Sequence, residues 1–299
     1  MPAPKSRGYG EIGYKGAVNE PPQNRLSEVQ YQRNRKTRGD WDAYTSHREH
    51  TTSLILEAAG ERDAPSLCLL GAGNGNDLDL TRLVDRFAEI SLVDLDGEAL
   101  GFCLSQLDPA DANRVHCVSH IDLSGLMHLL PSLALESPDS ERWQAAWKIA
   151  GAPPEARELG SFDVVVSTCL LTQMIDSVVT GLGDQHPSLA ELVIRLREGH
   201  LKLIASLLST EGSPLLTTDF VTSDTPPGSA SLPDSELGIY LKSAIEQRNF
   251  FTGTNPAVIA QQFGVLAATG KRVIVRGPWR WSMGPRTYAV CGFAAVASE

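Results

Sequence analysis

Short apolar runs alternate with longer amphipathic stretches between residues 66 and 222 of this chain. The apolar runs are SLCLLG, EISLVDLD, RVHCVSHID, FDVVVSTCL and GSPLLTTDFV. The stretches between them, such as NDLDLTRLVDRF, carry apolar residues at helical spacing. Short strands that alternate with helices pair in parallel through right-handed crossovers. The sequence therefore predicts an α/β fold built on a parallel sheet.

The C-terminal stretch KRVIVRGPWRWSMGPRTYAVCGFAAVA, residues 271–297, breaks this alternation. No helical stretch separates its two apolar runs, and Gly and Pro interrupt it at residues 277–278 and 284–285. Apolar runs joined by a short Gly- and Pro-containing turn are typical of a hairpin. We therefore expect an antiparallel hairpin at the end of the sheet.

Composition limits the possible classes of function. The chain has 299 residues, of which 42% are hydrophobic and 21% charged, as expected for a globular protein with a substantial core. The net charge of −10 disfavours non-specific binding to nucleic acid or a membrane surface. No run approaches the roughly 18 apolar residues of a membrane span. Five widely spaced cysteines without a CxxC pair predict no metal site and a reducing, cytoplasmic location.

The N-terminal segment differs from the rest of the chain. Residues 1–50 contain nine Lys and Arg against six Asp and Glu, whereas the whole chain is acidic. We interpret residues 1–38 as a partly mobile arm and residues 39–299 as the folded domain. The basic stretch YQRNRKTRGDW, residues 31–41, is compatible with RNA phosphates and stacked bases. A solvated arm is the alternative interpretation.

One connection is too long for a simple crossover. Between Asp122 and Phe162 lie 39 residues, and they include SERWQAAWKIAG with Trp143 and Trp147 at i and i+4. A compact crossover needs roughly half that length. We therefore predict a helical insertion over about residues 124–160. Either its tryptophans fix a surface helix to the domain, or the insertion forms a lid over a pocket.

Three alternating glycines follow the first strand, in LCLLGAGNGND at residues 67–77. Glycine lets the backbone turn sharply and approach a ligand closely. A dinucleotide fingerprint is GxGxxG, whereas here the third glycine comes one residue early and gives GxGxG. Asp77 is then expected at the start of the next helix. A carboxylate there repels a pyrophosphate and favours an ammonium group, which indicates a nucleoside carrying an amino acid rather than NAD.

Acidic residues end the next two strands. Asp94 lies 19 residues after Gly75, where a carboxylate accepts both hydroxyls of a ribose. Asp96, two residues on, is the better candidate for a helix N-cap. Asp122 ends the third strand and is placed to accept from an adenine amino group, although Asp-Leu-Ser is also a common turn. Ligands of open α/β sheets bind where these strand ends meet.

These motifs resemble the class I S-adenosylmethionine-dependent methyltransferases over about residues 40–297. The resemblance rests on LCLLGAGNGND, LVDLD, HID, FDVVVSTCLLTQM and the terminal hairpin. It implies a Rossmann-like methyltransferase fold with seven strands, an antiparallel C-terminal hairpin and helices on both faces. Many members carry an acidic residue before the first glycine, where this chain has Leu70. Asp77 is the candidate to supply that charge.

The resemblance also implies a cofactor site for S-adenosyl-L-methionine. Its residues would be Gly71, Ala72, Gly73, Asn74, Gly75, Asp77, Asp94, Leu95, Asp122, Leu123, Thr168, Cys169 and, for the carboxylate, Arg48. Candidates for the substrate pocket are Tyr31, Trp41, Tyr44 and His47. Gln173 and His186 are weak candidates for catalysis, since His186 could instead start a helix. No Pro precedes Cys169, so we interpret this residue as packing rather than as a nucleophile.

Methyl transfer from a sulfonium needs mainly alignment, with at most one general base. The sequence therefore favours methylation of a small molecule by proximity. The alternatives are an RNA or protein methyltransferase that uses the basic arm, a nicotinamide-dependent oxidoreductase, and a non-catalytic protein that binds the cofactor.

Overall fold

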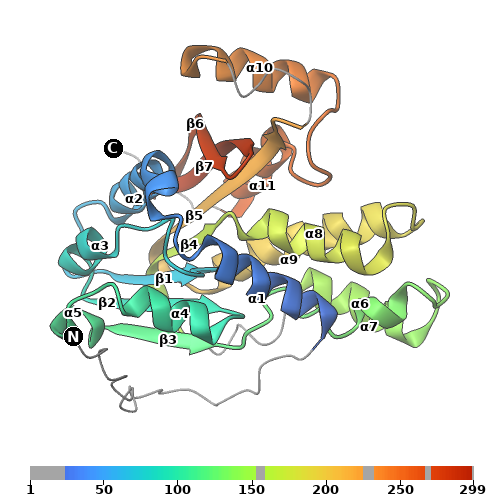
Figure 1. Cartoon of the computed structure of the whole chain (residues 1–299), viewed down its shortest axis with the longest axis horizontal. Coiled ribbons are helices and arrows are strands. Elements are labelled where there is room, and N and C mark those ends of the chain that lie inside the picture. Colours follow the sequence, from blue (N-terminus) through green and yellow to red (C-terminus); the bar gives the residue numbers. More distant parts are fainter. Residues whose placement is uncertain (1–23, 153–158, 225–231, 267–270, 298–299) are drawn as a thin grey trace, which may run out of the picture.

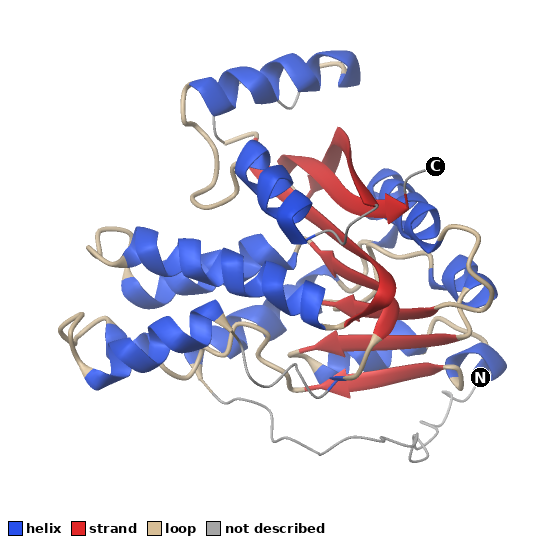
Figure 2. Cartoon of the chain, turned by 180° about the vertical axis from the view of Figure 1, so that it is seen from behind, coloured by secondary structure: helices blue, strands red, loops and turns tan. Residues whose placement is uncertain are grey.

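The computed structural model describes residues 24–152, 159–224, 232–266 and 271–297. In these residues seven strands form one sheet in the order β3-β2-β1-β4-β5-β7-β6 (Figures 1 and 2). They are β1 Ser66–Leu70, β2 Glu89–Asp94, β3 Val115–Ser119, β4 Phe162–Thr168, β5 Leu208–Thr222, β6 Lys271–Met283 and β7 Arg286–Ala297. The strands β1 to β5 are parallel, and β7 runs antiparallel to both β5 and β6. The predicted parallel sheet with a terminal antiparallel hairpin is confirmed.

Helices cover both faces of this sheet (Figures 1 and 2). In β1, Cys68 and Leu70 join the core under one layer of helices, while Leu67 and Leu69 join the core under the other. Because side chains alternate along a strand, an unbroken apolar run supplies both faces at once. The first layer contains α6 Leu130–Leu133, α7 Glu141–Gly151, α8 Leu170–Leu182, α9 Leu189–Ser206 and α11 Pro256–Leu266. The second contains α2 Thr45–Ala59, α3 Leu80–Arg86 and α4 Gly97–Leu104.

The strand order reverses at β1, which pairs with β2 on one side and with β4 on the other. The connections after β1 and β4 therefore diverge, and a crevice opens at the carboxyl ends of these strands. Open α/β sheets bind their ligands at this switch point.

Part of the predicted N-terminal arm is a helix that lies across the edge of the sheet. Residues Arg25–Thr37 form α1, capped at its start by Asn24, whose side chain accepts from the backbone of Leu26 and Ser27. Gln30 Nε2 donates to Ser177 Oγ on α8 at 3.1 Å, and α1 also contacts α4. A short 3-10 helix, η1 Trp41–Tyr44, then leads into α2. Residues 1–23 of the predicted arm lie outside the described residues. Among the described helices, none has the length and apolarity that a bilayer crossing needs.

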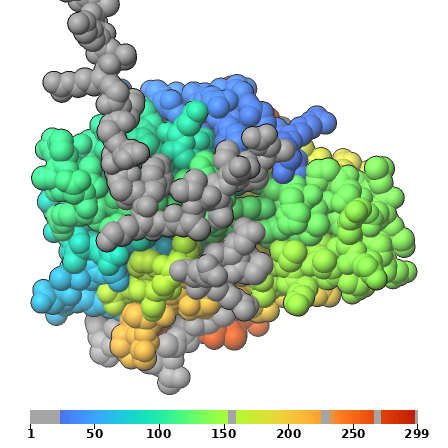
Figure 3. Space-filling model, turned by 90° about the horizontal axis from the view of Figure 1, so that it is seen from below, coloured from blue at the N-terminus to red at the C-terminus, as the bar shows by residue number. Residues whose placement is uncertain are grey.

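The insertion contains α6 and α7 and forms a lobe at one side of the molecule (green in Figure 3). Trp143 is fully buried, donates from its indole nitrogen to the Leu133 carbonyl at 3.2 Å and stacks on His186. α7 and α9 also pack so closely that a Cβ at Gly199 on α9 would clash with the Ala150 carbonyl on α7. These contacts favour the interpretation in which the tryptophans fix α7 to the domain. Residues 153–158 of the insertion lie outside the described part of the chain.

We predict that Trp143→Ala lowers the free energy of unfolding by about 3–5 kcal/mol, because it leaves a cavity between α7 and α9. Leu135→Ala is the matched control in the same lobe, since the Leu135 side chain is 90% exposed. We expect the control to change stability by less than about 0.5 kcal/mol. Denaturant unfolding measures both. Equal, small effects in the two variants would contradict the docking of α7.

Candidate functional site

The glycine loop between β1 and α3 adopts a conformation that only glycine takes easily. Gly71, Gly73 and Gly75 have φ values of +79°, +50° and +74°. At Gly75 a Cβ would also lie 2.5 Å from Cys103 Sγ on α4, so this glycine sets the distance between the loop and the helix layer. The loop reaches back to β2, where the Gly71 N–H donates to the Val93 carbonyl at 2.8 Å.

The helix after this loop starts later than predicted. We expected it to open with Asn76 and Asp77, but α3 begins at Leu80 and Asp79 is its N-cap. That prediction was wrong because Asp79 accepts from the Arg82 N–H and so ends the loop two residues after Asp77. The unpaired N–H groups that a helix N-terminus offers a pyrophosphate are thus set back from the glycines.

Asp94 ties the glycine loop to the end of β2. Its two carboxylate oxygens accept from the backbone N–H groups of Gly73 at 2.8 Å and Asp96 at 2.9 Å. Burial raises the pKa of Asp94 to about 6, although these hydrogen bonds oppose the shift. Each oxygen keeps a second lone pair, which suits a pair of hydroxyl donors. Asp96 instead caps α4 by accepting from the N–H groups of Glu98 and Ala99, as the sequence indicated.

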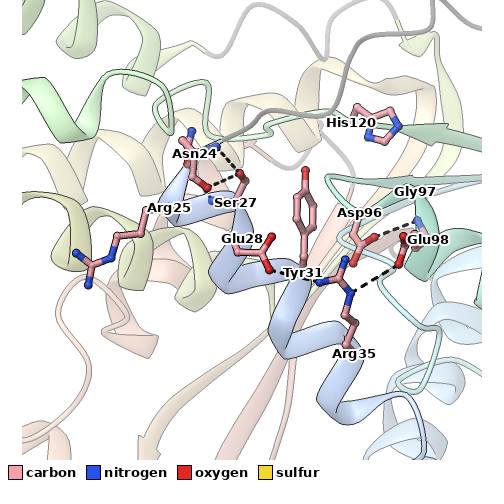
Figure 4. A pocket seen from close by; sticks show the side chains of 10 residues that line it. All are labelled: Asn24, Arg25, Ser27, Glu28, Tyr31, Arg35, Asp96, Gly97, Glu98 and His120. Atoms are coloured by element: carbon pink, nitrogen blue, oxygen red, sulfur yellow. Dashed lines mark hydrogen bonds and ion pairs between the residues drawn. The ribbon is translucent and has the colours of Figure 1, made fainter.

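A pocket of about 590 Å³ lies between α1, the start of α4 and the end of β3; Asp96 lines it, whereas Asp94, two residues earlier, does not. In Figure 4 the Tyr31 ring projects from α1 towards Asp96 and His120. Burial, together with the charges of Asp96 and Asp94, raises the pKa of Tyr31. His120 Nδ1 is buried and has no hydrogen-bond partner among the described residues. Two rings, carboxylates and an unsatisfied ring nitrogen thus surround a space of ligand size.

Asp122 and Leu123 have other contacts in this structure. Asp122 accepts from the N–H groups of Ser124 at 3.0 Å and Met127 at 2.8 Å, which fixes the loop after β3. Leu123 is buried in the core. The described residue after β3 that lines the pocket is His120, not Asp122 or Leu123. The adenine contact of Asp122 stays a prediction.

The end of β4 reaches the crevice from the other side. Thr168 Oγ1 donates to the Gly71 carbonyl at 3.3 Å, and Cys169 follows in a left-handed conformation at the start of α8. Burial, with Asp219 and Asp77 nearby, raises the pKa of the Cys169 thiol well above its usual value. The thiol is therefore neutral, in keeping with packing rather than nucleophilic attack.

Helix α1 is joined to the glycine loop by side-chain amides. Asn74 Nδ2 donates to the Asn34 carbonyl and Asn76 Nδ2 to the Thr37 carbonyl, both at 2.7 Å. Asn34 Nδ2 in turn donates to Asp96 Oδ2 at 3.0 Å. The C-terminal half of α1 thus covers the loop between the pocket and the β4 end.

Arg48 and Trp41 support the loop from the other helix layer. The Arg48 guanidinium lies 3.6 Å from the centre of the Trp41 ring and donates to the carbonyls of Trp41 and Asn76. A third hydrogen bond runs from Nη2 to Thr45 Oγ1. These bonds hold α2 against the end of the glycine loop, and the predicted contact of Arg48 with a cofactor carboxylate stays untested.

His47 and Tyr44 lie among aromatic side chains from β6. Trp279 Nε1 donates to His47 Nδ1 at 3.0 Å, and the His47 ring stacks on Trp281 at 4.6 Å. Tyr44 packs edge-on against Trp281 and donates to Met283 Sδ at 3.2 Å. Burial lowers the pKa of His47 to about 3, so its ring is neutral.

Asp77 points towards this aromatic group. Its Oδ1 lies 3.7 Å from His47 Nε2, beyond hydrogen-bond distance, and the side chain is 19% exposed. Burial raises the pKa of Asp77 to about 7; Asp219 adds to the shift and Arg48 opposes it. Asp219, on β5, accepts from Thr172 Oγ1 at 2.5 Å, and burial raises its pKa to about 6.

Sequence reasoning did not select Asp219. The signal was an acidic residue inside an otherwise apolar and Thr-rich strand, LLTTDFV. Burying a charged side chain in such a run costs free energy unless the charge is paired or hydrogen-bonded.

The two weak catalytic candidates lie elsewhere. His186 Nδ1 accepts from the Ser188 N–H at 3.1 Å in the turn before α9, and its ring stacks on Trp143. Gln173 is exposed on α8. The contacts of His186 favour the helix-start interpretation that the sequence left open.

No protein-family model and no curated protein matches this chain. Solved structures do match. A precorrin-6y C5,15-methyltransferase from Geobacter metallireducens is 15% identical, with 82% of this chain and 87% of that chain covered and a TM-score of 0.37. An O-methyltransferase family protein from Burkholderia thailandensis is 14% identical, covering 91% and 63%, with a TM-score of 0.43. CalO1, a calicheamicin-biosynthesis methyltransferase solved with S-adenosylhomocysteine, is 18% identical, covering 91% and 57%, with a TM-score of 0.39.

All three matches are named as methyltransferases. The sequence resemblance implied a mostly parallel sheet of seven strands with an antiparallel C-terminal hairpin, and the structure has this sheet, in the strand order β3-β2-β1-β4-β5-β7-β6. By this topology the chain has the Rossmann-like methyltransferase fold. The roles of individual residues depend on the contacts described above.

We predict that Asp77→Asn stabilises the protein at pH 8 by roughly 1–3 kcal/mol, because it removes a largely buried carboxylate that accepts no hydrogen bond from the described residues. The folded pKa of Asp77 is about 7 and the unfolded value lies near 4, so the folded state holds its proton more tightly. Ionisation therefore costs stability as the pH rises between these values, and the difference between variant and wild type should shrink towards zero near pH 4. Denaturant unfolding across this range measures it.

Asp184→Asn is the control for this prediction, because Asp184 is exposed. It should show no pH-dependent difference from the wild type. An Asp77→Asn variant that is less stable than the wild type at pH 8 would contradict the assignment.

Proposed function

We propose that this chain is an S-adenosyl-L-methionine-dependent methyltransferase that acts on a small molecule. The observation that carries the proposal is Asp94, a carboxylate at the switch point that joins the glycine loop to β2 and lies two residues before Asp96, which lines the pocket together with Tyr31 and His120. A carboxylate with lone pairs left over beside two rings fits the diol and base of an adenosine.

The described residues fit this cofactor. The pocket volume of about 590 Å³ lies within the range of small-molecule sites. The buried His120 Nδ1 lacks a partner, which a base or ribose donor would supply. Asp94 would hold the ribose, Tyr31 and His120 would flank the nucleoside, and the loop from Gly71 to Gly75 would lie along the methionine part. Tyr31 thereby moves from the predicted acceptor pocket to the nucleoside side.

When bound, the cofactor supplies a methyl group already activated as a sulfonium. The protein then has three tasks: to hold the nucleoside, to exclude water and to align the acceptor. Helix α1 excludes water, since its amide contacts with Asn74 and Asn76 close the loop from above. Thr168 fixes the end of β4 against Gly71, which sets the wall along which the acceptor approaches.

Two observations favour a small molecule over the alternatives. Arg33 forms an ion pair with Asp176, and Arg35 forms ion pairs with Glu28 and Glu98. These two arginines of the basic stretch are therefore partly neutralised by acidic residues of the same chain, which weakens their attraction for RNA phosphates. A nicotinamide dinucleotide would need the helix N-terminus near the glycines, and α3 starts at Leu80 with its first turn capped by Asp79.

We predict that Asp94→Asn weakens S-adenosylhomocysteine binding more than about tenfold, because an amide cannot accept from both ribose hydroxyls while also holding Gly73. Isothermal titration calorimetry on the full chain measures the affinity. Asp85→Asn, an exposed acid on α3, is the matched control and should bind like the wild type.

Titration with NADH tests the cofactor class in the same experiment. Binding of NADH without binding of S-adenosylhomocysteine would overturn the proposal. Unchanged S-adenosylhomocysteine affinity in a folded Asp94→Asn variant would remove Asp94 from the site.

A further inference from the structure

A second polar group lies along the same edge of the sheet, over β4 and β5. It consists of Asp77, Asp219, His47, Tyr44 and Trp281, and we call it the acid–aromatic cluster. Its members come from the glycine loop, β5, α2, η1 and β6. Asp77 Oδ1 lies 3.7 Å from His47 Nε2, and Asp219 on β5 accepts from Thr172 Oγ1, three residues after Cys169 at the end of β4. The charge of Asp219 contributes to the raised pKa values of both Asp77 and Cys169.

Asp77 is influenced by the charge of Arg48 from beyond ion-pair distance, and neither carboxylate of this cluster has a direct Lys or Arg partner among the described residues. Among the described residues, no Lys or Arg forms an ion pair with Asp77 or Asp219, and the nearest basic group is the neutral His47 ring at 3.7 Å. The neighbouring Arg48 donates instead to Trp41, Asn76 and Thr45. Buried carboxylates are normally paired or bound to a cation, so this arrangement points to a ligand.

His47 gives independent support, because one of its nitrogens has no partner. Trp279 donates to Nδ1, so the proton of the neutral ring is on Nε2. His47 Nε2 is fully buried, has no hydrogen-bond partner in the described part of the chain and lies 3.7 Å from Asp77 Oδ1. The Trp281 indole nitrogen, on the ring stacked against His47, is also buried without a partner. Unsatisfied buried donors beside an unpaired carboxylate are expensive unless something binds there.

The order of the strands relates this cluster to the nucleoside pocket. The pocket lies over β2 and β3, the glycine loop over β1, and the cluster over β4 and β5. A ligand whose nucleoside lies at Asp94 and whose chain follows the glycine loop therefore ends beside Cys169. The cluster is the next polar group along that line.

Resting on the methyltransferase function proposed above, we propose that the acid–aromatic cluster binds the methyl acceptor and that this acceptor is an amine. Asp77 and Asp219 bind the ammonium form, and the packed rings of Tyr44 and Trp281 form an aromatic wall beside it, since aromatic faces attract cations. Because Asp77 is 19% exposed on its side chain, the cluster has access from outside.

The carboxylates also supply the proton acceptor that the transfer needs. An ammonium nitrogen has no lone pair, so one carboxylate first takes a proton and leaves a neutral amine. The nitrogen lone pair then forms a bond to the methyl carbon while the carbon–sulfur bond breaks, and that electron pair stays on sulfur as a neutral thioether. The positive charge passes from sulfur to the methylated nitrogen, and the abstracted proton leaves to solvent.

The test uses benzylamine as the probe and benzyl alcohol as its uncharged counterpart. Calorimetry is run on the full chain, with and without saturating S-adenosylhomocysteine. We expect benzylamine to bind, and benzyl alcohol to bind at least about tenfold more weakly. Asp77→Asn and Asp219→Asn should each weaken benzylamine binding more than about tenfold, with Asp184→Asn as the matched exposed control.

The remaining outcomes separate the alternatives. Failure of benzylamine to bind, or equal binding by all variants, overturns the proposal. If Asp77→Asn weakens S-adenosylhomocysteine binding but leaves benzylamine binding unchanged, Asp77 binds the ammonium group of the cofactor itself. That result would overturn the assignment of Asp77 to the acceptor site. The protein could instead bind benzylamine in a way that depends on the two carboxylates but fail to bind S-adenosylhomocysteine. That result would support the amine site and overturn the proposed function.

Thermal melts establish that each variant folds. If Asp219→Asn does not fold, Thr172→Val removes the hydrogen bond that orients Asp219 and replaces it in the test. It should weaken benzylamine binding about three- to tenfold. Its S-adenosylhomocysteine affinity should stay within about twofold of the wild type, and benzylamine affinity that equals the wild type would count against Asp219.

Discussion

The hydrogen bond from the Gly73 N–H to Asp94 is the contact on which the candidate site depends. It fixes the glycine loop against the end of β2, at the point where the sheet order reverses. With the loop held there, the side chains of Asn74 and Asn76 reach α1, and the Asn76 carbonyl accepts from Arg48 on α2. Both the helix that covers the crevice and the helix that supports it from behind are thus attached to one loop.

This attachment explains why α1 belongs to the site although it precedes the domain in sequence. The helix is rich in polar residues, and only three of its residues are buried: Leu26, Ser27 and Gln30. What fixes it are amide contacts with Asn74, Asn76 and Asp96, which are specific in geometry rather than strong. A helix held mainly by such bonds is suited to cover a ligand, because it separates from the loop at little cost in buried apolar area.

The parts predictable from sequence are those encoded locally. Strand β1 reads as LCLL because both faces are buried, and Asp94 could be placed because a parallel strand ends where its ligand-facing residue begins. Asp122 shows the limit of this reasoning, since a turn and an adenine contact require the same residue at the same position. The start of α3 was misplaced because the choice among Asn76, Asp77 and Asp79 as cap depends on which carboxylate reaches the Arg82 N–H.

Contacts between distant segments could not be predicted. Trp279 meets His47 across 232 residues of sequence, and Asp219 approaches Asp77 only because β5 lies beside β4, which pairs with β1. No periodicity in either segment encodes that pairing. An acidic residue within a strand indicates only that its burial costs free energy. The residue that offsets this cost can be identified only from the folded structure.

The two ends of the crevice treat buried carboxylates differently, and the difference has chemical consequences. Asp94 accepts from two backbone N–H groups, which stabilise its charge and leave lone pairs for neutral hydroxyls. Asp77 accepts from none of the described residues, and its nearest neighbour is a neutral ring. A carboxylate that already accepts hydrogen bonds from the backbone is suited to bind further neutral donors. A carboxylate that accepts no hydrogen bond is stabilised most by a cation. The edge of this sheet is therefore polarised along its length: the carboxylate at the end of β2 is hydrogen-bonded to the backbone, whereas Asp77 in the glycine loop accepts no hydrogen bond from the described residues.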